Sequence, residues 1–145
     1  SPHLAAQIEN RPMDFDKVEQ DFKQAQERTD YLTVEGSGGI ICPLRWDDVE
    51  HVVLDDLVLR LGLSALVVAD AGLGTINAAV LTAEHLRMRG ISLKGFIFNN
   101  WQGGTMQEDN VRMVEALTGA PVLACVEHGA VELPMAADAL AALYD

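Results

Sequence analysis

Apolar residues along this chain alternate between short continuous runs and longer stretches with helical spacing. In residues 14–28 they recur at three- and four-residue steps, which predicts a helix. Further helices are predicted over residues 49–61, 75–89, 105–117 and 135–144, and strands over residues 31–34, 65–69, 94–98 and 121–126. Segment 1–12, with Pro2 and Pro12 as breakers, and the glycine-rich segment 36–44 are predicted to be loops.

The alternation of strands and helices predicts an α/β fold. Two of the strands, 65–69 and 121–126, are continuous apolar runs, which are typical of parallel strands buried on both faces. We therefore expect a parallel sheet flanked by helices on both faces. Because no internal repeat, low-complexity stretch or linker interrupts the pattern, we expect one α/β domain over residues 1–145.

The segment 69–77 reads ADAGLGTIN, follows an apolar strand and opens a long predicted helix. The first turn of a helix has free N–H groups and a partial positive charge, which together favour anions. Glycines let a ligand approach the backbone, and Thr75 or Asn77 adds a side-chain donor. The alternative is an ordinary glycine turn between a strand and a helix. The segment 34–39, VEGSGG, has the same character and favours the anion site.

Ligands of parallel sheets bind beyond the carboxyl ends of the strands. Four predicted strand ends carry polar or glycine-rich residues, namely Glu35, Asp70–Gly74, Asn99–Asn100 and Glu127–His128. Glu35 beside its glycine loop suits a Mg²⁺ ion that bridges phosphates, or it is an exposed loop residue. The amide of Asn99 donates and accepts, which suits the edge of a purine base, although asparagine is also an ordinary turn residue.

Composition and charge limit the classes of function. The chain has 145 residues, of which 49% are hydrophobic, enough for a real core. Its net charge of −12 argues against nucleic acid and anionic membranes as partners. Cys42 and Cys125 have neither metal spacing nor a disulfide framework, so we expect reduced thiols in the cytoplasm. We expect neither a membrane span nor a signal peptide.

Two kinds of motif are missing from the sequence. No arrangement of residues suggests a nucleophile, so no catalytic residue is assigned. No run matches G-x-x-x-x-G-K-[ST], the loop that cradles nucleotide phosphates.

Several segments, taken in order, carry a resemblance to a known family. They are residues 1–6, residues 34–39 followed by Pro43-Leu44, residues 73–77 with Leu81-Thr82, residues 95–99 and residues 120–123. Together they resemble the dethiobiotin synthetases, ATP-dependent enzymes of the P-loop class, over essentially the whole chain. The resemblance implies a P-loop NTPase-like fold whose first strand, P-loop and next helix would precede Ser1. We therefore expect this chain to be the C-terminal part of such a domain.

The resemblance also implies a reaction and its participants. Members of the family use Mg²⁺ and ATP to close the ureido ring of dethiobiotin from 7,8-diaminononanoate and CO₂, through a carbamic–phosphoric anhydride, in biotin biosynthesis. A homodimer is implied, because the partner subunit contacts the carboxylate tail of the substrate. Phosphoryl transfer of this kind depends on positioning and charge stabilisation.

Site residues follow from the resemblance, position by position. Glu35 would bind Mg²⁺, and Asn99, Val126 and Glu127 would contact the nucleotide base. The diamine and its carbamate would be lined by Gly36, Ser37, Gly38 and Gly39. The carboxylate tail of the substrate would be received by Gly74, Thr75, Ile76 and Asn77.

Three positions depart from the family pattern, and two other functions stay open. Ala78 stands where histidine is frequent, Asn100 where aspartate is common, and Glu127 where proline is usual, which puts the nucleotide preference in question. One alternative is a non-catalytic ligand-binding or regulatory domain on the same scaffold, and another is a structural α/β module. Glu35 beside its glycine loop favours the enzyme over the structural module. The start at Ser1, which resembles a cut within a domain, favours the enzyme over the regulatory domain.

Overall fold

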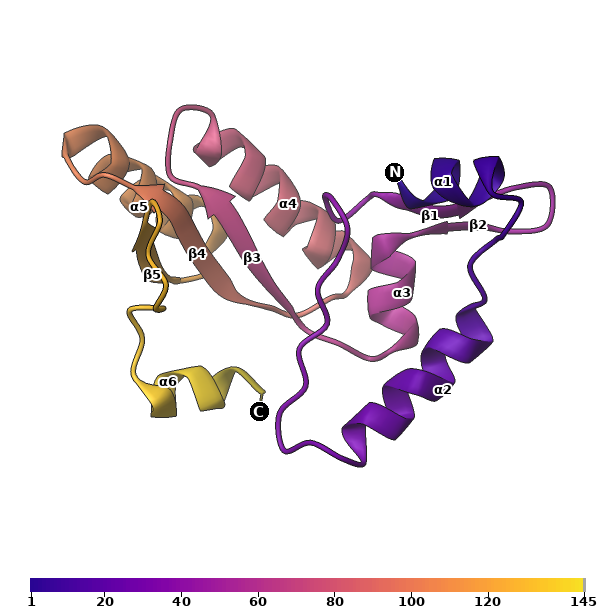
Figure 1. Ribbon diagram of the computed structural model, residues 1–145. Coiled ribbons are helices and arrows are strands. Elements are labelled where there is room, and N and C mark those ends of the chain that lie inside the picture. The colour runs from indigo at the N-terminus through magenta and orange to yellow at the C-terminus, as the bar shows by residue number, and fades with distance from the viewer. Residues whose placement is uncertain (145) are drawn as a thin grey trace. The chain divides into compact units, whose positions relative to one another are not determined.

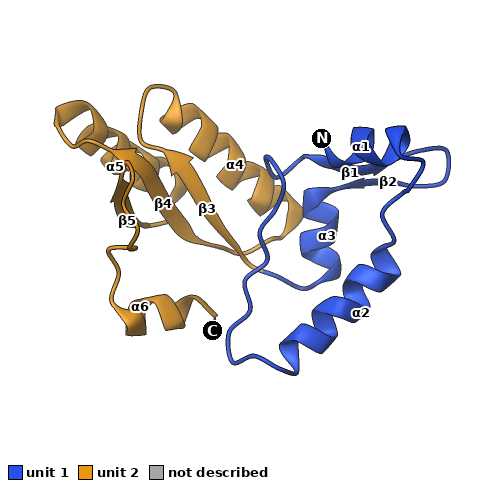
Figure 2. Ribbon diagram, viewed as in Figure 1, with its two compact units in different colours: residues 1–63 blue, residues 64–145 orange. Residues whose placement is uncertain are grey.

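Two compact units make up the chain in a computed structural model, which describes residues 1–144 (Figure 1). Ser1–Leu63 form the first unit and Ser64–Asp145 the second (Figure 2). Each unit has its own cluster of buried apolar residues. The expectation of one α/β domain over residues 1–145 stays a prediction.

The first unit begins with two helices, α1 (Pro2–Ile8) and α2 (Phe15–Gln26). The predicted helix over 14–28 is confirmed, and Asp14 caps it by accepting a hydrogen bond from the backbone N–H of Lys17 at 3.1 Å. The predicted loop over 1–12 is wrong for most of its length. Proline is tolerated in the first turn of a helix, where its missing N–H is not needed, so Pro2 starts α1 rather than preventing it.

A β-hairpin and a short helix complete the first unit: β1 (Pro43–Trp46), β2 (His51–Val53) and α3 (Leu54–Arg60). The helix predicted over 49–61 is therefore wrong in its first part, where β2 pairs antiparallel with β1. Val52 is 2% exposed and packs with Phe15 and Leu44, so burial of a β-branched residue favours the strand here.

The strand predicted over residues 31–34 is also wrong, because this segment is irregular. A strand needs a hydrogen-bonded neighbour, and the strands of residues 1–144 pair only as β1 with β2 and as β3–β4–β5. Tyr31 and Val34 are 58% and 43% exposed, so this segment also lacks the apolar burial that stabilises a strand.

The second unit alternates strands and helices as predicted. Its elements are β3 (Ala65–Asp70), α4 (Thr75–Arg89), β4 (Leu93–Trp101), α5 (Thr105–Thr118) and β5 (Val122–Glu127), followed by α6 (Ala137–Ala141) and the 3₁₀ turn η1 (Ala142–Tyr144). The three strands form a parallel sheet in the order β3–β4–β5, which confirms the predicted class of fold. The helix predicted over 135–144 is shorter, and begins only after Ala136.

Helices α4 and α5 contact each other and pack against the sheet (Figure 1). Phe96 and Phe98 of β4 are fully buried in this core, and the small side chains of Ala79 and Ala83 let α4 lie close to them. Successive side chains of a strand point to opposite faces, and on the other face of β3 Leu66 and Val68 are 38% and 64% exposed. The expectation that residues 65–69 are buried on both faces is therefore wrong for residues 1–144.

Candidate functional site

The turn after β3 is built by Asp70 and two glycines. Oδ1 of Asp70 accepts a hydrogen bond from the backbone N–H of Gly72 at 2.8 Å, which bends the chain away from the strand. A Cβ atom at position 72 would lie 2.8 Å from the same oxygen, so a side chain there would disturb the turn. Gly74 has φ of 92° and occupies the N-cap of α4, a conformation that glycine adopts without strain.

The N-terminus of α4 lies at the edge of a shallow depression of about 380 Å³. Thr75 lines it, is only 5% exposed, and its Oγ1 has no hydrogen-bond partner among residues 1–144. The rest of the lining is largely apolar and comprises Val67, Val68, Ala69, Leu73, Ala78 and Ala79 with Asp70, Gly74 and Thr82. Free N–H groups and a buried hydroxyl beside an apolar wall suit a ligand with an anionic end and an aliphatic chain.

Side chains join the carboxyl ends of the three parallel strands. Nδ2 of Asn100 donates to Oδ2 of Asp70 at 2.7 Å, and Oδ1 of Asn100 lies 3.0 Å from Nδ1 of His128. The hydrogen bond from Asn100, and after it the N–H of Gly72, lower the pKa of Asp70, which therefore stays ionised. The predicted convergence of the ends of β3, β4 and β5 is confirmed.

Asn99 occupies the same edge and is exposed. It lies opposite Asp70 in the register of β4 with β3, at the end of the strand that also carries Asn100. On β5, Val126 is half-buried and Glu127 is exposed. These positions agree with a surface open to a ligand, and the roles of these three residues stay predictions.

The glycine loop that carries Glu35 belongs to the first unit, and residues 35–39 are all exposed. Its far end is held by backbone bonds, since Ile40 and Cys42 accept from the N–H groups of Asp55 and Leu54 at 3.0 and 2.9 Å. A Cβ at Gly36 would lie 2.5 Å from Cδ2 of Leu54, so only glycine fits there without displacing that side chain. Whether Glu35 joins the sheet edge of the second unit stays a prediction.

A preformed cluster of metal ligands is not found in the part of the chain that the structure describes. Mg²⁺ commonly takes one or two protein carboxylates and completes its shell with phosphates and water. One exposed carboxylate, such as Glu35, is compatible with that mode of binding.

Two buried polar residues on α5 were missed by the sequence analysis. Oε1 of Gln107 accepts from the N–H groups of Gln102 and Gly103, and Nδ2 of Asn110 donates to the carbonyl oxygens of Ala71 and Gly72. Their spacing with the buried Val114 follows the helical period, so they share its inward face. Polar residues on the apolar stripe of a predicted helix were the signal that could have revealed them.

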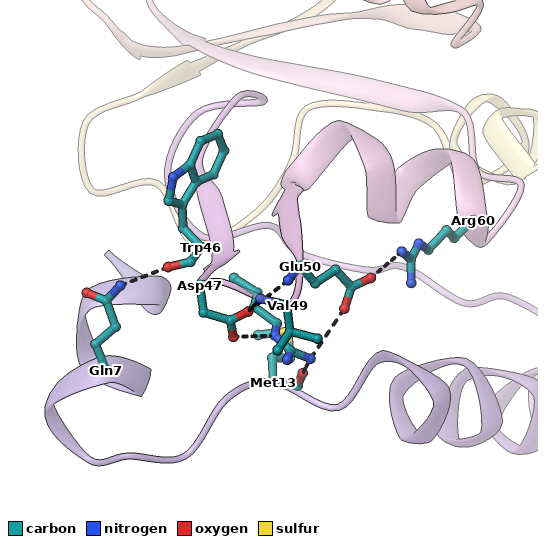
Figure 3. Close-up of polar contacts among 8 residues, drawn as sticks. Gln7, Met13, Trp46, Asp47, Val49, Glu50 and Arg60 are labelled. Carbon is teal, nitrogen blue, oxygen red and sulfur yellow. Dashed lines mark hydrogen bonds and ion pairs between the residues drawn. The ribbon is translucent and has the colours of Figure 1, made fainter.

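A second polar cluster ties the first unit together (Figure 3). Arg45 pairs with Asp47 at 2.7 Å and with Glu50 at 3.3 Å, and Glu50 pairs with Arg60 at 2.6 Å. The hydrogen bond from Arg45, with backbone N–H bonds from Glu50 and Val49, lowers the pKa of Asp47 to about 2. These charges satisfy one another, so the cluster stabilises the hairpin rather than offering a free binding group.

Within residues 1–144 no helix has both the length and the apolar character needed to cross a membrane.

Comparisons with known proteins place the chain in a family. A family model described as an AAA domain (AAA_26) matches residues 1–131. Proteins named ATP-dependent dethiobiotin synthetase BioD are 42% identical over 134 residues in Brachyspira hyodysenteriae, 43% over 128 in Clostridium kluyveri and 38% over 127 in Clostridium novyi. These matches cover 92%, 88% and 87% of this chain, but only 61%, 53% and 53% of the relatives.

The chain therefore spans little more than half the length of the curated relatives that it matches. The resemblance to dethiobiotin synthetases is confirmed over nine-tenths of the chain in the first of these relatives. A model that matches 131 of the 145 residues covers far more than half of the sequence. This chain belongs to the AAA domain family.

Proposed function

We propose that the complete gene product closes the ureido ring of dethiobiotin from 7,8-diaminononanoate and CO₂, using Mg²⁺ and ATP. The observation that supports this proposal is the depression at the N-terminus of α4, where a glycine turn and the start of the helix adjoin an apolar wall. The diamine has the matching chemistry, because a carboxylate ends its aliphatic chain. The names of the relatives support the same activity.

In this proposal the turn Gly74–Asn77 receives the carboxylate tail. The N–H of Thr75 donates to the carbonyl oxygen of Gly72 at 3.3 Å, so the N–H groups of Ile76 and Asn77 donate to the carboxylate oxygens. The buried Oγ1 of Thr75 gains the partner that it lacks. Burial makes this hydroxyl effective, since an unpaired buried polar atom favours any ligand that satisfies it. Gly36, Ser37, Gly38 and Gly39 line the diamine and its carbamate.

The nucleotide lies at the edge formed by β4 and β5. The exposed amide of Asn99 donates to and accepts from the adenine base, and the loop after Val126, with Glu127, flanks the base. The hydrogen-bonded Asp70, Asn100 and His128 keep the strand ends in register beneath it.

The reaction requires little covalent chemistry from the protein. One amine of the substrate adds to CO₂ and loses a proton to form a carbamate, whose oxygen attacks the γ-phosphorus of ATP and displaces ADP. The second amine then attacks the carbamate carbon, the C–O bond to phosphate breaks, and the ring closes with release of phosphate and a proton. Glu35 would hold Mg²⁺, which when bound would neutralise charge on the phosphates. The remaining residues orient the reacting groups.

We further propose a homodimer in the cytoplasm. By the resemblance, the turn at α4 serves the active site of the partner subunit, so one copy would be incomplete without the other. Sedimentation of the complete gene product tests this, and a monomer at assay concentration would contradict it.

The test of the function is direct assay of the complete gene product with 7,8-diaminononanoate, bicarbonate, ATP and Mg²⁺. We expect dethiobiotin by mass spectrometry and phosphate release that depends on the diamine. Asn77→Ala should weaken diamine binding, because it removes a side-chain donor at the turn. Ligand binding without product would indicate a regulatory domain, and loss of both would overturn the proposal.

A further inference from the structure

We propose that Gln107 and Asn110 of α5 are positioning residues, which hold two ligand-binding segments separately. Asn110 holds the turn after β3 that presents the N-terminus of α4 to an anionic group. Gln107 holds the loop after β4, beyond the base-contacting Asn99. This inference deepens the proposed function and rests on it for the identity of the ligands.

Asn110 donates hydrogen bonds to backbone carbonyl groups in the turn after β3. Its Nδ2 lies 3.1 Å from the carbonyl oxygen of Ala71 and 3.4 Å from that of Gly72. Asp70 holds the N–H of Gly72 from the other side at 2.8 Å. The two side chains together fix the peptide planes that lead into α4, and Asn110 is the buried member of the pair, at 8% exposed.

Gln107 acts on the segment that follows β4. Its Oε1 accepts from the backbone N–H of Gln102 at 2.8 Å and from that of Gly103 at 3.0 Å. Gly103 and Gly104 both have positive φ, so this segment has little conformational restraint of its own. Gln107 is 6% exposed, and its bonds fix where the chain leaves β4.

Both residues connect their loops to the same helix, α5. They lie three positions apart on the inward face of α5, whose Val114 is fully buried in the apolar core of the second unit. A loop that is hydrogen-bonded to a side chain on a packed helix is held more precisely than a loop without such support. The turn for the anionic group and the loop beside the base therefore share a common support.

The two side chains use opposite halves of their amides, which gives a chemical test. Gln107 uses only its oxygen as an acceptor, so Gln107→Glu keeps the atom that the loop needs. Asn110 uses its nitrogen as a donor, so Asn110→Asp turns a carboxylate oxygen toward two carbonyl oxygens. The two nearly isosteric changes should therefore have opposite outcomes.

The experiment measures both KM values in the complete gene product. Asn110→Ala should raise the KM for the diamine by about tenfold and leave that for ATP within about twofold, with a larger effect in Asn110→Asp. Gln107→Ala should instead raise the KM for ATP by about tenfold, and Gln107→Glu should bring it back to within about twofold of the wild type. Arg112→Ala, on the exposed face of the same helix, is the matched control.

A merely structural role gives a different pattern. It would lower the thermal midpoint and the amount of folded protein without separating the two KM values, and that outcome would overturn the inference. So would a Gln107→Glu variant that behaves like Gln107→Ala.

Amide hydrogen exchange tests the positioning roles without relying on turnover. If the wild type makes no dethiobiotin, the proposed function fails, and exchange measured in the same variants still shows whether each residue holds its own segment. Faster exchange over residues 71–77 in Asn110→Ala alone, and over residues 102–104 in Gln107→Ala alone, supports separate positioning. Equal changes across both segments in both variants would contradict it.

Discussion

The side-chain amide of Asn100 donates to the carboxylate of Asp70 over 2.7 Å and so joins the ends of β4 and β3. Asn100 holds this position at φ of 58°, in the left-handed region that asparagine tolerates better than most residues. The residue therefore meets two requirements at once, a backbone conformation and a bridging amide. Few side chains meet both.

Substitution of Asn100 separates these two requirements. Asn100→Gly removes the amide and keeps an easy left-handed backbone, whereas Asn100→Ala removes the amide and adds conformational strain. We expect both variants to have a lower free energy of unfolding than the wild type. That of Asn100→Ala should be lower than that of Asn100→Gly by about 1 kcal/mol. Urea unfolding measures this difference. Equal stability of the two variants would mean that the backbone strain has been misassigned.

Acid should weaken the hairpin through Asp47. Its pKa falls from 3.8 to about 2 in the folded state, so the unfolded state takes up its proton first as the pH drops. The stabilisation from Asp47 is therefore present above about pH 4 and is lost as the pH falls toward 2. Asp47→Asn should lower stability at neutral pH and flatten the decline between those values.

Acid titrations of unfolding, followed by circular dichroism, test this expectation. Asp48→Asn is the matched control, because Asp48 is an exposed neighbour in the same turn. An unchanged acid profile in Asp47→Asn would show that the pairing with Arg45 does not contribute to stability.

Gly95 allows the start of β5 to approach β4. It has φ of 150°, and a Cβ there would lie 2.7 Å from the carbonyl oxygen of Pro121 and 2.9 Å from the side chain of Leu123. Gly95→Ala should cost about 2–3 kcal/mol in the free energy of unfolding, because a backbone oxygen must move. Gly90→Ala, with positive φ but open space, should cost only about 1 kcal/mol. Similar losses in both variants would argue against the close approach.

Glu35 should be required for turnover but not for folding. Because the residue is exposed, Glu35→Gln in the complete gene product should unfold like the wild type. We expect turnover with Mg²⁺ and ATP to fall by about a hundredfold, the order of loss when one charge-stabilising contact is removed. Glu9→Gln, an exposed change in the same unit, is the control. Normal turnover of Glu35→Gln would contradict the proposed role of Glu35 in binding Mg²⁺.

The local pattern of apolar residues was sufficient to predict most helices and strands of the second unit. Residues 75–89 form the helix that their periodicity predicts, and its C-cap Gly90 has the left-handed conformation typical of that position. The first unit was harder, because the strand predicted over 31–34 has no pairing neighbour in residues 1–144. Val52 and Val53 lie in a strand rather than a helix because the hairpin buries Val52.

The polar edge of the sheet was predictable because parallel strands bring their carboxyl ends together. That rule could not identify the residues that support the edge from behind. Gln107 and Asn110 are polar residues of the kind that usually lie on the surface of a helix. Their spacing with Val114 was the one sequence signal for their burial, and only packing shows which backbone groups they reach.

By itself the sequence determined the order of strands and helices in the second unit and the polar strand ends, because periodicity, glycine caps and apolar runs act over a few residues. The tertiary structure alone decided which backbone groups the buried amides reach. Asn110 binds carbonyl oxygens 38 and 39 positions away, and Asn100 binds a carboxylate 30 positions away. The contacts of Asn110 depend on how α5 packs in the second unit, and that of Asn100 on the pairing of β4 with β3, and no local pattern encodes either.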